Sequence, residues 1–252
     1  MNKFEIIKDT KEQKIKDIKK MKNDFDSKNK KKLLKFSKSI PNIFAKVPEQ
    51  QKLIILIDIV GFSKSTTRQQ VYNIYLFQRY LTIEVLTSKF SFSSKIKINQ
   101  FIPTGDGCYI VADKCAPQYA LKFLTTLISG FKEMQDSDNN PLALRVSALI
   151  GECVQFMDIA KHINFVGEGM NEASRILSGG QSFLEEKFLQ NHKSAEILDA
   201  KKYSRNSLYL GDSLTSNIND FKKNCDEIFY FKNVADKHGK MRNITVLQNV
   251  KV

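Results

Sequence analysis

The chain has 252 residues, of which 42% are hydrophobic, and this length suffices for one domain with a sizeable core plus a short appendage. No apolar run approaches the ~18 residues that a transmembrane helix needs, and the N-terminus has no signal-peptide segment, so we expect a cytoplasmic protein without a transmembrane segment. Four scattered cysteines and three histidines form no ligand pattern, which argues against disulfides and a zinc site.

The formal net charge of +13 is unevenly distributed along the chain. Residues 1–50 hold 15 lysines and 7 acidic residues and carry +8 of this charge. A lysine-rich segment can bind nucleic acid through phosphate contacts, but such runs are more often solvated helix faces or flexible arms. We therefore expect no stable nucleic-acid complex, and a nucleic-acid-binding protein that acts through this segment stays open as an alternative.

The N-terminal segment 1–47 differs from the rest and is expected to be a basic helical leader with a linker. Apolar residues at helical spacing predict a short amphipathic helix around 8–36. These residues are Ile15, Ile18, Met21 and Phe25. The remainder, 48–252, is expected to form one globular domain.

The domain reads as strand, helix, strand, strand, helix, strand, followed by further elements. The six core elements are expected at 52–60, 65–88, 96–103, 107–113, 116–134 and 144–157. We then expect a helix at 169–178 that ends at Gly179–Gly180, a helical stretch near 182–190, and strands near 195–199, 227–233 and 243–249. This order is typical of an α+β fold with a ferredoxin-like βαββαβ core and extra C-terminal strands, in which one sheet has its helices on one face.

Two apolar strands each deliver one carboxylate to a bend that contains glycine. Asp58 ends the first strand, and Asp106 lies in the TGDG turn between the second and third strands. Two carboxylates presented in this way suit hard divalent cations, which prefer oxygen ligands and keep open positions for phosphates. The bend after the first strand leads into a helix, so the backbone N–H groups of Gly61, Phe62 and Ser63 suit phosphate oxygens.

A third motif, GEGMNEASRIL at 167–177, supplies Asn171 and Arg175. They are four residues apart on an expected helix and therefore share one face. An arginine there can neutralise charge that develops on a phosphate, and an asparagine can hold a sugar hydroxyl. Each motif alone is common in turns, hairpins and helix surfaces, so the conjunction of the three motifs carries the interpretation.

In this order and spacing, the three motifs resemble the catalytic domain of class III nucleotidyl cyclases over about residues 51–180. The resemblance implies an enzyme that closes a nucleoside triphosphate into a 3′,5′-cyclic monophosphate and releases pyrophosphate by two-metal in-line attack. It implies that two divalent cations, Mn²⁺ or Mg²⁺, are held by Asp58, Asp106 and the Ile59 carbonyl. It also implies that Asn171 holds the ribose and that Arg175 acts on the α-phosphate.

The same resemblance implies an assembly. In the family, the carboxylate pair and the Asn/Arg pair come from different catalytic domains that meet head to tail. This chain carries both pairs, so a homodimer with two composite active sites is expected. Near the C-terminus, DKHGK at 236–240 loosely resembles the family's phosphate-binding lysine strand, with Lys237 and Lys240 as the candidates.

The chain departs from the family at the two positions that read the base. Adenylate cyclases have lysine and aspartate there, guanylate cyclases glutamate and usually cysteine, whereas this chain has Ile102 and Asn164. An isoleucine side chain cannot form a hydrogen bond. A polar base edge that is buried without a hydrogen-bond partner makes the binding free energy of that base less favourable. An alignment shift, or adenine held by backbone groups, would also account for the difference.

The P-T-G-D-G turn and the G-x-G-x-N-x-A-S-R motif resemble the Pycsar pyrimidine cyclases of bacterial antiphage defence. That resemblance implies cyclic UMP or cyclic CMP as the product and a separate cyclic-nucleotide-sensing effector downstream. UTP is narrowly favoured over CTP, since the Asn164 amide could serve either base. Two alternatives stay open: an adenylate cyclase of general signalling, and a catalytically inactive cyclase-like module that binds nucleotide.

Overall fold

The computed structural model describes part of the chain in two compact units, Met1–Pro48 and Glu49–Val252. The described residues are 16, 27–29, 31, 48–86, 95–137, 142–158, 160–192, 205–216, 218–235, 239–248 and 250. In the first unit, Lys16, residues 27–29 and Lys31 are helical, and most of the helix predicted at 8–36 lies outside the described residues. None of the helices in the described ranges is long and apolar enough to cross a membrane.

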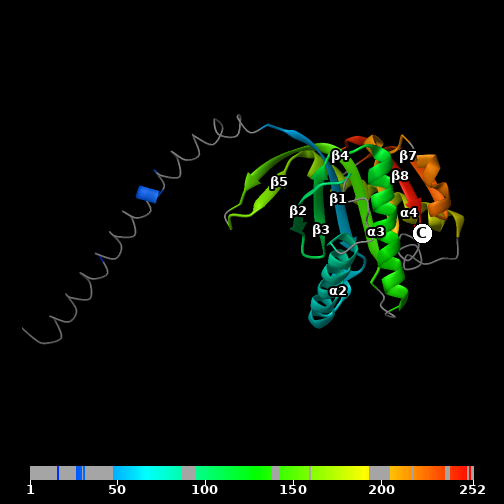
Figure 1. Cartoon of the computed structure of the whole chain (residues 1–252), viewed down its shortest axis with the longest axis horizontal. Coiled ribbons are helices and arrows are strands. Elements are labelled where there is room, and N and C mark those ends of the chain that lie inside the picture. Colours follow the sequence, from blue (N-terminus) through cyan, green and yellow to red (C-terminus); the bar gives the residue numbers. More distant parts are fainter. Residues whose placement is uncertain are drawn as a thin grey trace, which may run out of the picture. The chain divides into compact units, whose positions relative to one another are not determined.

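The second unit is built on an eight-stranded sheet (Figure 1). Seven strands follow the order β2-β3-β1-β4-β6-β8-β7, and β5 pairs with β4. The β4–β6 pairing is parallel and the other pairings are antiparallel. The strands are β1 Gln50–Ile59, β2 Ile98–Pro103, β3 Gly107–Asp113, β4 Leu144–Met157, β5 Ile163–Val166, β6 Ser207–Gly211, β7 Glu227–Ala235 and β8 Met241–Gln248.

Three long helices and three short 3₁₀ helices accompany the sheet (Figure 1). The long helices are α2 Thr67–Leu86, α3 Pro117–Ser137 and α4 Glu168–Asn191. The 3₁₀ helices are η1 Phe62–Lys64, η2 Asp212–Leu214 and η3 Ile218–Asn224. The order β1-α2-β2-β3-α3-β4 is the βαββαβ core predicted from the sequence, and the α+β class is confirmed.

Both faces of the central strand β1 are buried, each in its own core. Because side chains alternate along a strand, Leu53 and Ile55 belong to the core that includes α2 and α3, whereas Ile54 packs against α4. Burial on two sides explains the unbroken apolar run LIILI. It also corrects the expectation that all helices pack on one face, since α4 covers the face opposite to α2 and α3.

Helix α4 differs from its prediction because it does not end at Gly179–Gly180 but continues to Asn191. A Cβ on Gly180 would lie 2.5 Å from Cδ1 of Tyr209 on β6, so this glycine allows the helix to approach the sheet closely. The stretch predicted near 182–190 is therefore the second half of the same helix.

The predicted bounds of β3 and β4 are confirmed, whereas β5 and β6 were not predicted. The strands predicted near 227–233 and 243–249 correspond to β7 and β8. The strand predicted near 195–199 lies outside the described residues.

Candidate active site

The Asp58–Asp106 pair forms at one end of the β1–β3 ladder. Asp58 pairs with Gly107 across the two strands, and the N–H of Ile59 donates to the Asp106 carbonyl oxygen at 2.9 Å. Gly105, which opens the turn, has a left-handed φ of 100° that favours glycine. The Asp106 carboxyl lies within hydrogen-bonding reach of Asp58. The structure therefore brings together the two carboxylates that the sequence singled out.

The pKa of the Asp58 carboxyl is shifted by its burial and by its two charged neighbours. Burial raises the pKa of the Asp58 carboxyl, the Arg145 guanidinium opposes this shift, and the neighbouring Asp106 carboxyl adds to it. Only 16% of the Asp58 side chain is exposed. Two acids in this arrangement repel one another, and a bound cation would relieve that repulsion.

The residues present fit divalent cations shared with a substrate. Among the described residues, no group of three or more His, Cys, Asp or Glu side chains could enclose a metal ion. Two carboxylates with open positions are instead typical of Mg²⁺ or Mn²⁺ held jointly with phosphates. The Ile59 side chain has no ligand atom, so its backbone carbonyl would be the group that joins Asp58 and Asp106 as a ligand.

Arg145 is a site residue that the sequence analysis missed. It lies on β4 opposite Asp58, and its Nη2 donates to Asp58 Oδ2. Its Nη1 donates to Oε1 of Gln181 on α4. An arginine at the start of an otherwise apolar strand was the available signal, because a buried charge needs a partner.

The bend after β1 departs in part from its prediction. Gly61 has a left-handed φ of 76°, and Phe62 and Ser63 belong to the three-residue 3₁₀ helix η1. The long helix α2 begins only at Thr67, after a capping box in which Thr66 and Gln69 exchange hydrogen bonds. The bend therefore offers backbone N–H groups, but not at the N-terminus of a long helix.

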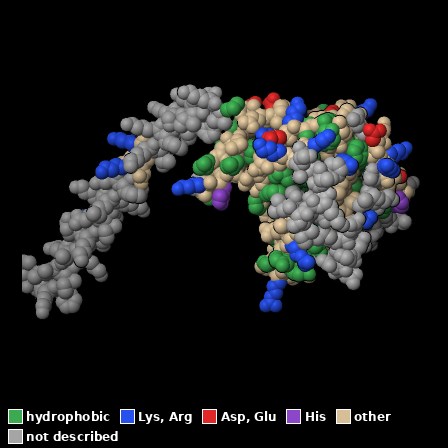
Figure 2. All heavy atoms as spheres, in the orientation of Figure 1, with side chains coloured by type: hydrophobic (Ala, Val, Ile, Leu, Met, Phe, Trp, Pro, Cys, Tyr) green, Lys and Arg blue, Asp and Glu red, His purple; other side chains and the backbone are tan. Residues whose placement is uncertain are grey.

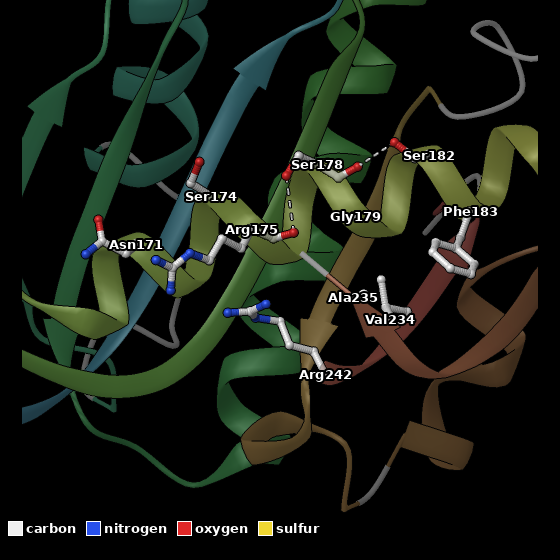
Figure 3. Close-up of a pocket in the computed structure, with 10 residues that line it drawn as sticks. All are labelled: Asn171, Ser174, Arg175, Ser178, Gly179, Ser182, Phe183, Val234, Ala235 and Arg242. Carbon is white, nitrogen blue, oxygen red and sulfur yellow. Dashed lines mark hydrogen bonds between the residues drawn. The ribbon is translucent and has the colours of Figure 1, made fainter. Parts of the chain in front are cut away.

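Asn171 and Arg175 line a pocket of about 690 Å³ beside α4 (Figure 3). The opposite side of the pocket includes Arg242 of β8. Figure 3 shows the guanidinium groups of Arg175 and Arg242 turned toward each other. The other lining residues are Ser174, Ser178, Gly179, Ser182, Phe183, Val234 and Ala235.

Two carboxylates hold the cations of this pocket. Oε1 of Glu168 accepts from Arg175 Nη1 at 2.8 Å and from Lys240 Nζ at 2.9 Å. The hydrogen bond from Lys240 is the main cause that holds the pKa of Glu168 below its usual range, and Arg175 adds to this effect. Glu172 accepts from Nε and Nη2 of Arg242. Lys240 and Arg175 thus share the carboxylate of Glu168, whereas Lys237 lies outside the described residues.

The carboxylate pair and the Asn/Arg pair do not meet within one chain. Among the described residues, Asp58 is linked to α4 through Arg145 and Gln181, and Gln181 is six residues, or about 9 Å of helix, beyond Arg175. Asp58 forms an ion pair with Arg145, whereas Arg175 forms ion pairs with Glu168 and Glu172.

The two positions expected to read the base, Ile102 and Asn164, lie on strands that contact one another, β2 and β5. Ile102 pairs with Tyr109, and both pack against the core on the α4 side. The Tyr109 hydroxyl donates to the Met170 carbonyl, next to Asn171. The Asn164 side-chain oxygen accepts the N–H of Phe165 at 2.8 Å.

Solved structures with this arrangement of strands and helices exist. The adenylyl cyclase CyaB from P. aeruginosa is 16% identical, with a TM-score of 0.52 over 82% of this chain and 97% of its own. The guanylate cyclase domain of RhGC from Catenaria anguillulae, solved with GTP, is 16% identical, with a TM-score of 0.50 over 81% and 100%. The guanylyl cyclase Cya2 is 12% identical, with a TM-score of 0.51 over 81% and 98%.

The chain has the nucleotidyl cyclase fold. At these identities, the likeness concerns the fold rather than the substrate. No protein-family model matches the chain. No curated protein matches it either. The cyclase fold accounts for 81–82% of the chain in these comparisons, so the structural likeness extends well beyond residue 180, to which the sequence motifs are confined.

Proposed function

We propose that this protein is a nucleotidyl cyclase that converts a nucleoside triphosphate into its 3′,5′-cyclic monophosphate and pyrophosphate. The observation that carries the proposal is the pairing of Asp58 with Asp106 on a cyclase fold whose helix α4 presents Asn171 and Arg175 to a pocket. Intact residues at all four positions argue against the inactive-module alternative.

The reaction requires the 3′-hydroxyl to attack the α-phosphorus while pyrophosphate leaves. Asp58 and Asp106 would hold two divalent cations, which when bound lower the pKa of that hydroxyl and neutralise the triphosphate. Arg175 could release Glu168 and bind the α-phosphate instead, because an ion pair with an exposed carboxylate contributes little stability and breaks readily. Asn171, on the same face of α4, would hold the ribose.

The proposed enzyme is a homodimer with composite sites. Each chain presents its carboxylate pair and its Asn/Arg pair at separate places, so a second copy is needed to unite them. Apolar side chains are exposed on α2 and on the β4–β5 hairpin, and Figure 2 shows hydrophobic atoms gathered over both elements. Such exposed groups are typical of interfaces. They are Val71, Tyr72, Tyr75, Met157, Ile163 and Val166.

The proposed substrate is a pyrimidine triphosphate. Ile102 is partly buried against the core and offers no hydrogen bond to a purine edge. Asn164 already accepts through its oxygen, which leaves its amide nitrogen as a donor. A donor matches the 4-oxo group of uracil better than the 4-amino group of cytosine, so UTP is favoured. The antiphage role and the cyclic-UMP-sensing effector belong to the same proposal and rest on the Pycsar resemblance.

The test is to incubate purified protein with Mn²⁺ and each of the four nucleoside triphosphates and to identify the products by mass spectrometry. Cyclic UMP is the expected main product. ATP as the sole substrate would replace the pyrimidine proposal with the adenylate cyclase alternative. Absence of any cyclic product would favour the inactive module.

A further inference from the structure

A largely buried ion pair joins Arg145 to Asp58. The two residues pair across β4 and β1, on the sheet face that α4 covers. Only 16% of each side chain is exposed, so solvent screens their attraction little. Arg145 therefore acts on Asp58 as a fixed positive charge.

The other hydrogen bonds of the Arg145 guanidinium show how its orientation is fixed. Nη1 donates to Oε1 of Gln181, and Nε2 of Gln181 donates to Oε1 of Glu185 at 2.7 Å. The Arg145 Nε is buried without a hydrogen-bond partner among the described residues. An arginine kept only to complete a hydrogen-bond network would use this donor as well. Its Nη groups are instead directed at one carboxylate and at one amide that orients them.

The charges around Arg145 do not balance. Two carboxyl groups, those of Asp58 and Asp106, lie at this end of the β1–β3 ladder, whereas Arg145 supplies one guanidinium group to them. We propose that Arg145 is the internal counter-cation of the Asp58–Asp106 pair: it positions Asp58 and offsets part of the carboxylate repulsion until a divalent cation binds there. Arg145 is a positioning residue in this inference, which rests on the metal site of the proposed function.

This role has two linked consequences. Arg145→Gln keeps a side chain of moderate size but leaves the two acids without compensation, so the metal-free protein loses stability. The same change removes a positive charge that repels the incoming cation, so the cation binds more tightly. A purely structural ion pair would lower stability equally with and without metal.

The chain offers a second cross-strand ion pair as a control, whose carboxylate is more exposed than that of Asp58 (43% against 16% of the side chain). Lys52, at the other end of β1, is 8% exposed and binds Asp113 of β3 at 2.7 Å. Like Arg145–Asp58, this pair joins neighbouring strands of the sheet. Lys52→Gln therefore reports the loss of a cross-strand ion pair that is remote from the carboxylate site.

The experiment uses the full chain without nucleotide and compares wild type, Arg145→Gln, Arg145→Lys and Lys52→Gln. The Tm is measured with and without Mn²⁺, and Mn²⁺ affinity is measured from the EPR signal of the free ion. We expect Arg145→Gln to lower the metal-free Tm by roughly 6 °C or more. We expect it to tighten Mn²⁺ binding on the order of 10-fold, whereas Arg145→Lys, which keeps the charge, stays within about twofold of wild type.

Adding Mn²⁺ should restore the Tm of Arg145→Gln but not that of Lys52→Gln. Mn²⁺ binding by Arg145→Gln that is no tighter than by wild type would overturn the inference. If Arg145→Gln does not fold in metal-free buffer, recovery on refolding in millimolar Mn²⁺ becomes the readout, and failure to recover overturns the inference.

These outcomes separate the inference from the proposed function. If Arg145→Gln binds Mn²⁺ more tightly but the protein cyclises none of the four triphosphates, the counter-cation role of Arg145 stands and the cyclase proposal is rejected. If the wild type is an active cyclase but Arg145→Gln binds Mn²⁺ no more tightly, the cyclase proposal stands and the counter-cation role is rejected.

Discussion

Asp58 and Gly107 face each other across β1 and β3 so closely that residue 107 has no room for a side chain. A Cβ on Gly107 would lie 1.9 Å from the carbonyl oxygen of Ile57. Asp106 precedes this glycine and is tied to β1 by the 2.9 Å hydrogen bond from Ile59. The carboxylate pair therefore depends on a residue that is not itself a candidate ligand.

Gly107→Ala should destabilise the protein and displace Asp106, because the two strands must move apart to admit a methyl group. We expect a loss of about 3 kcal/mol in the free energy of unfolding, measured by urea denaturation, together with loss of Mn²⁺ binding. Gly179→Ala in α4 is the control, since its Cβ would meet only side-chain atoms, Cγ1 of Val234 at 3.2 Å and Cδ1 of Ile244 at 3.4 Å, which need to move by only a few tenths of an ångström, and alanine favours helix. Wild-type stability of Gly107→Ala would contradict the prediction.

Asp106→Asn should abolish turnover while leaving the fold intact. The amide has the size of the carboxyl but is a poor ligand for a hard cation, so we expect the cyclisation rate to fall by about 10³-fold or more. Circular dichroism and the Tm should stay close to wild type, because the repulsion with Asp58 is also removed. Substantial residual turnover would argue against Asp106 as a metal ligand.

Mixing inactive Asp58→Ala chains with inactive Arg175→Ala chains should restore part of the activity. Random exchange makes half of the dimers mixed, and each mixed dimer holds one whole site of two, so recovery of about a quarter of wild-type activity is expected. The matched control mixes Asp58→Ala with Asp106→Ala, which spoils both sites of every mixed dimer. No recovery in the first mixture after chain exchange would contradict composite sites.

Cys108, next to Gly107, makes stability depend on alkaline pH. Burial raises the pKa of its thiol to about 12 from 9.0. The folded-state pKa is the higher one, so the contribution to stability is fully present below pH 9 and declines as pH rises toward 12, by about 1.4 kcal/mol per pH unit.

Wild type should therefore lose about 2 kcal/mol relative to Cys108→Ala between pH 8 and pH 10.5, as measured by urea unfolding at both values. Other cysteines and tyrosines titrate equally in the two proteins, so their contributions cancel in the comparison. Parallel behaviour of the two proteins with pH would show that the thiol is not protected.

The double substitution Ile102→Lys and Asn164→Asp should move substrate preference from UTP toward ATP. It introduces the pair that the adenylate cyclase resemblance associates with adenine, and a matched polar pair is worth about 10²-fold or more in kcat/KM discrimination. The measurement is kcat/KM for both triphosphates, with Asn164→Asp alone as the comparison. An unchanged ratio would indicate that these positions do not contact the base.

Local sequence patterns were sufficient for the core of this fold. The burial of β1 and of the first half of β4, together with the glycines around Asp106, leaves signals within a few residues. The βαββαβ order and the proximity of Asp58 to Asp106 could therefore be predicted. The short strands β5 and β6, of four and five residues, carry too few side chains to show a period.

Other features depend on partners that are remote along the chain. Gly180 looked like a helix end because the ring that requires a glycine there, Tyr209, lies on β6. The contact of Arg145 with Asp58 could not be predicted because the two residues are 87 positions apart in the sequence. The register of β4 with β1 brings them together. Composition and spacing thus identified the candidate carboxylates and their strands, because these are local properties. The burial of their charges, and the cation that offsets them, were decided by the packing of the sheet against α4.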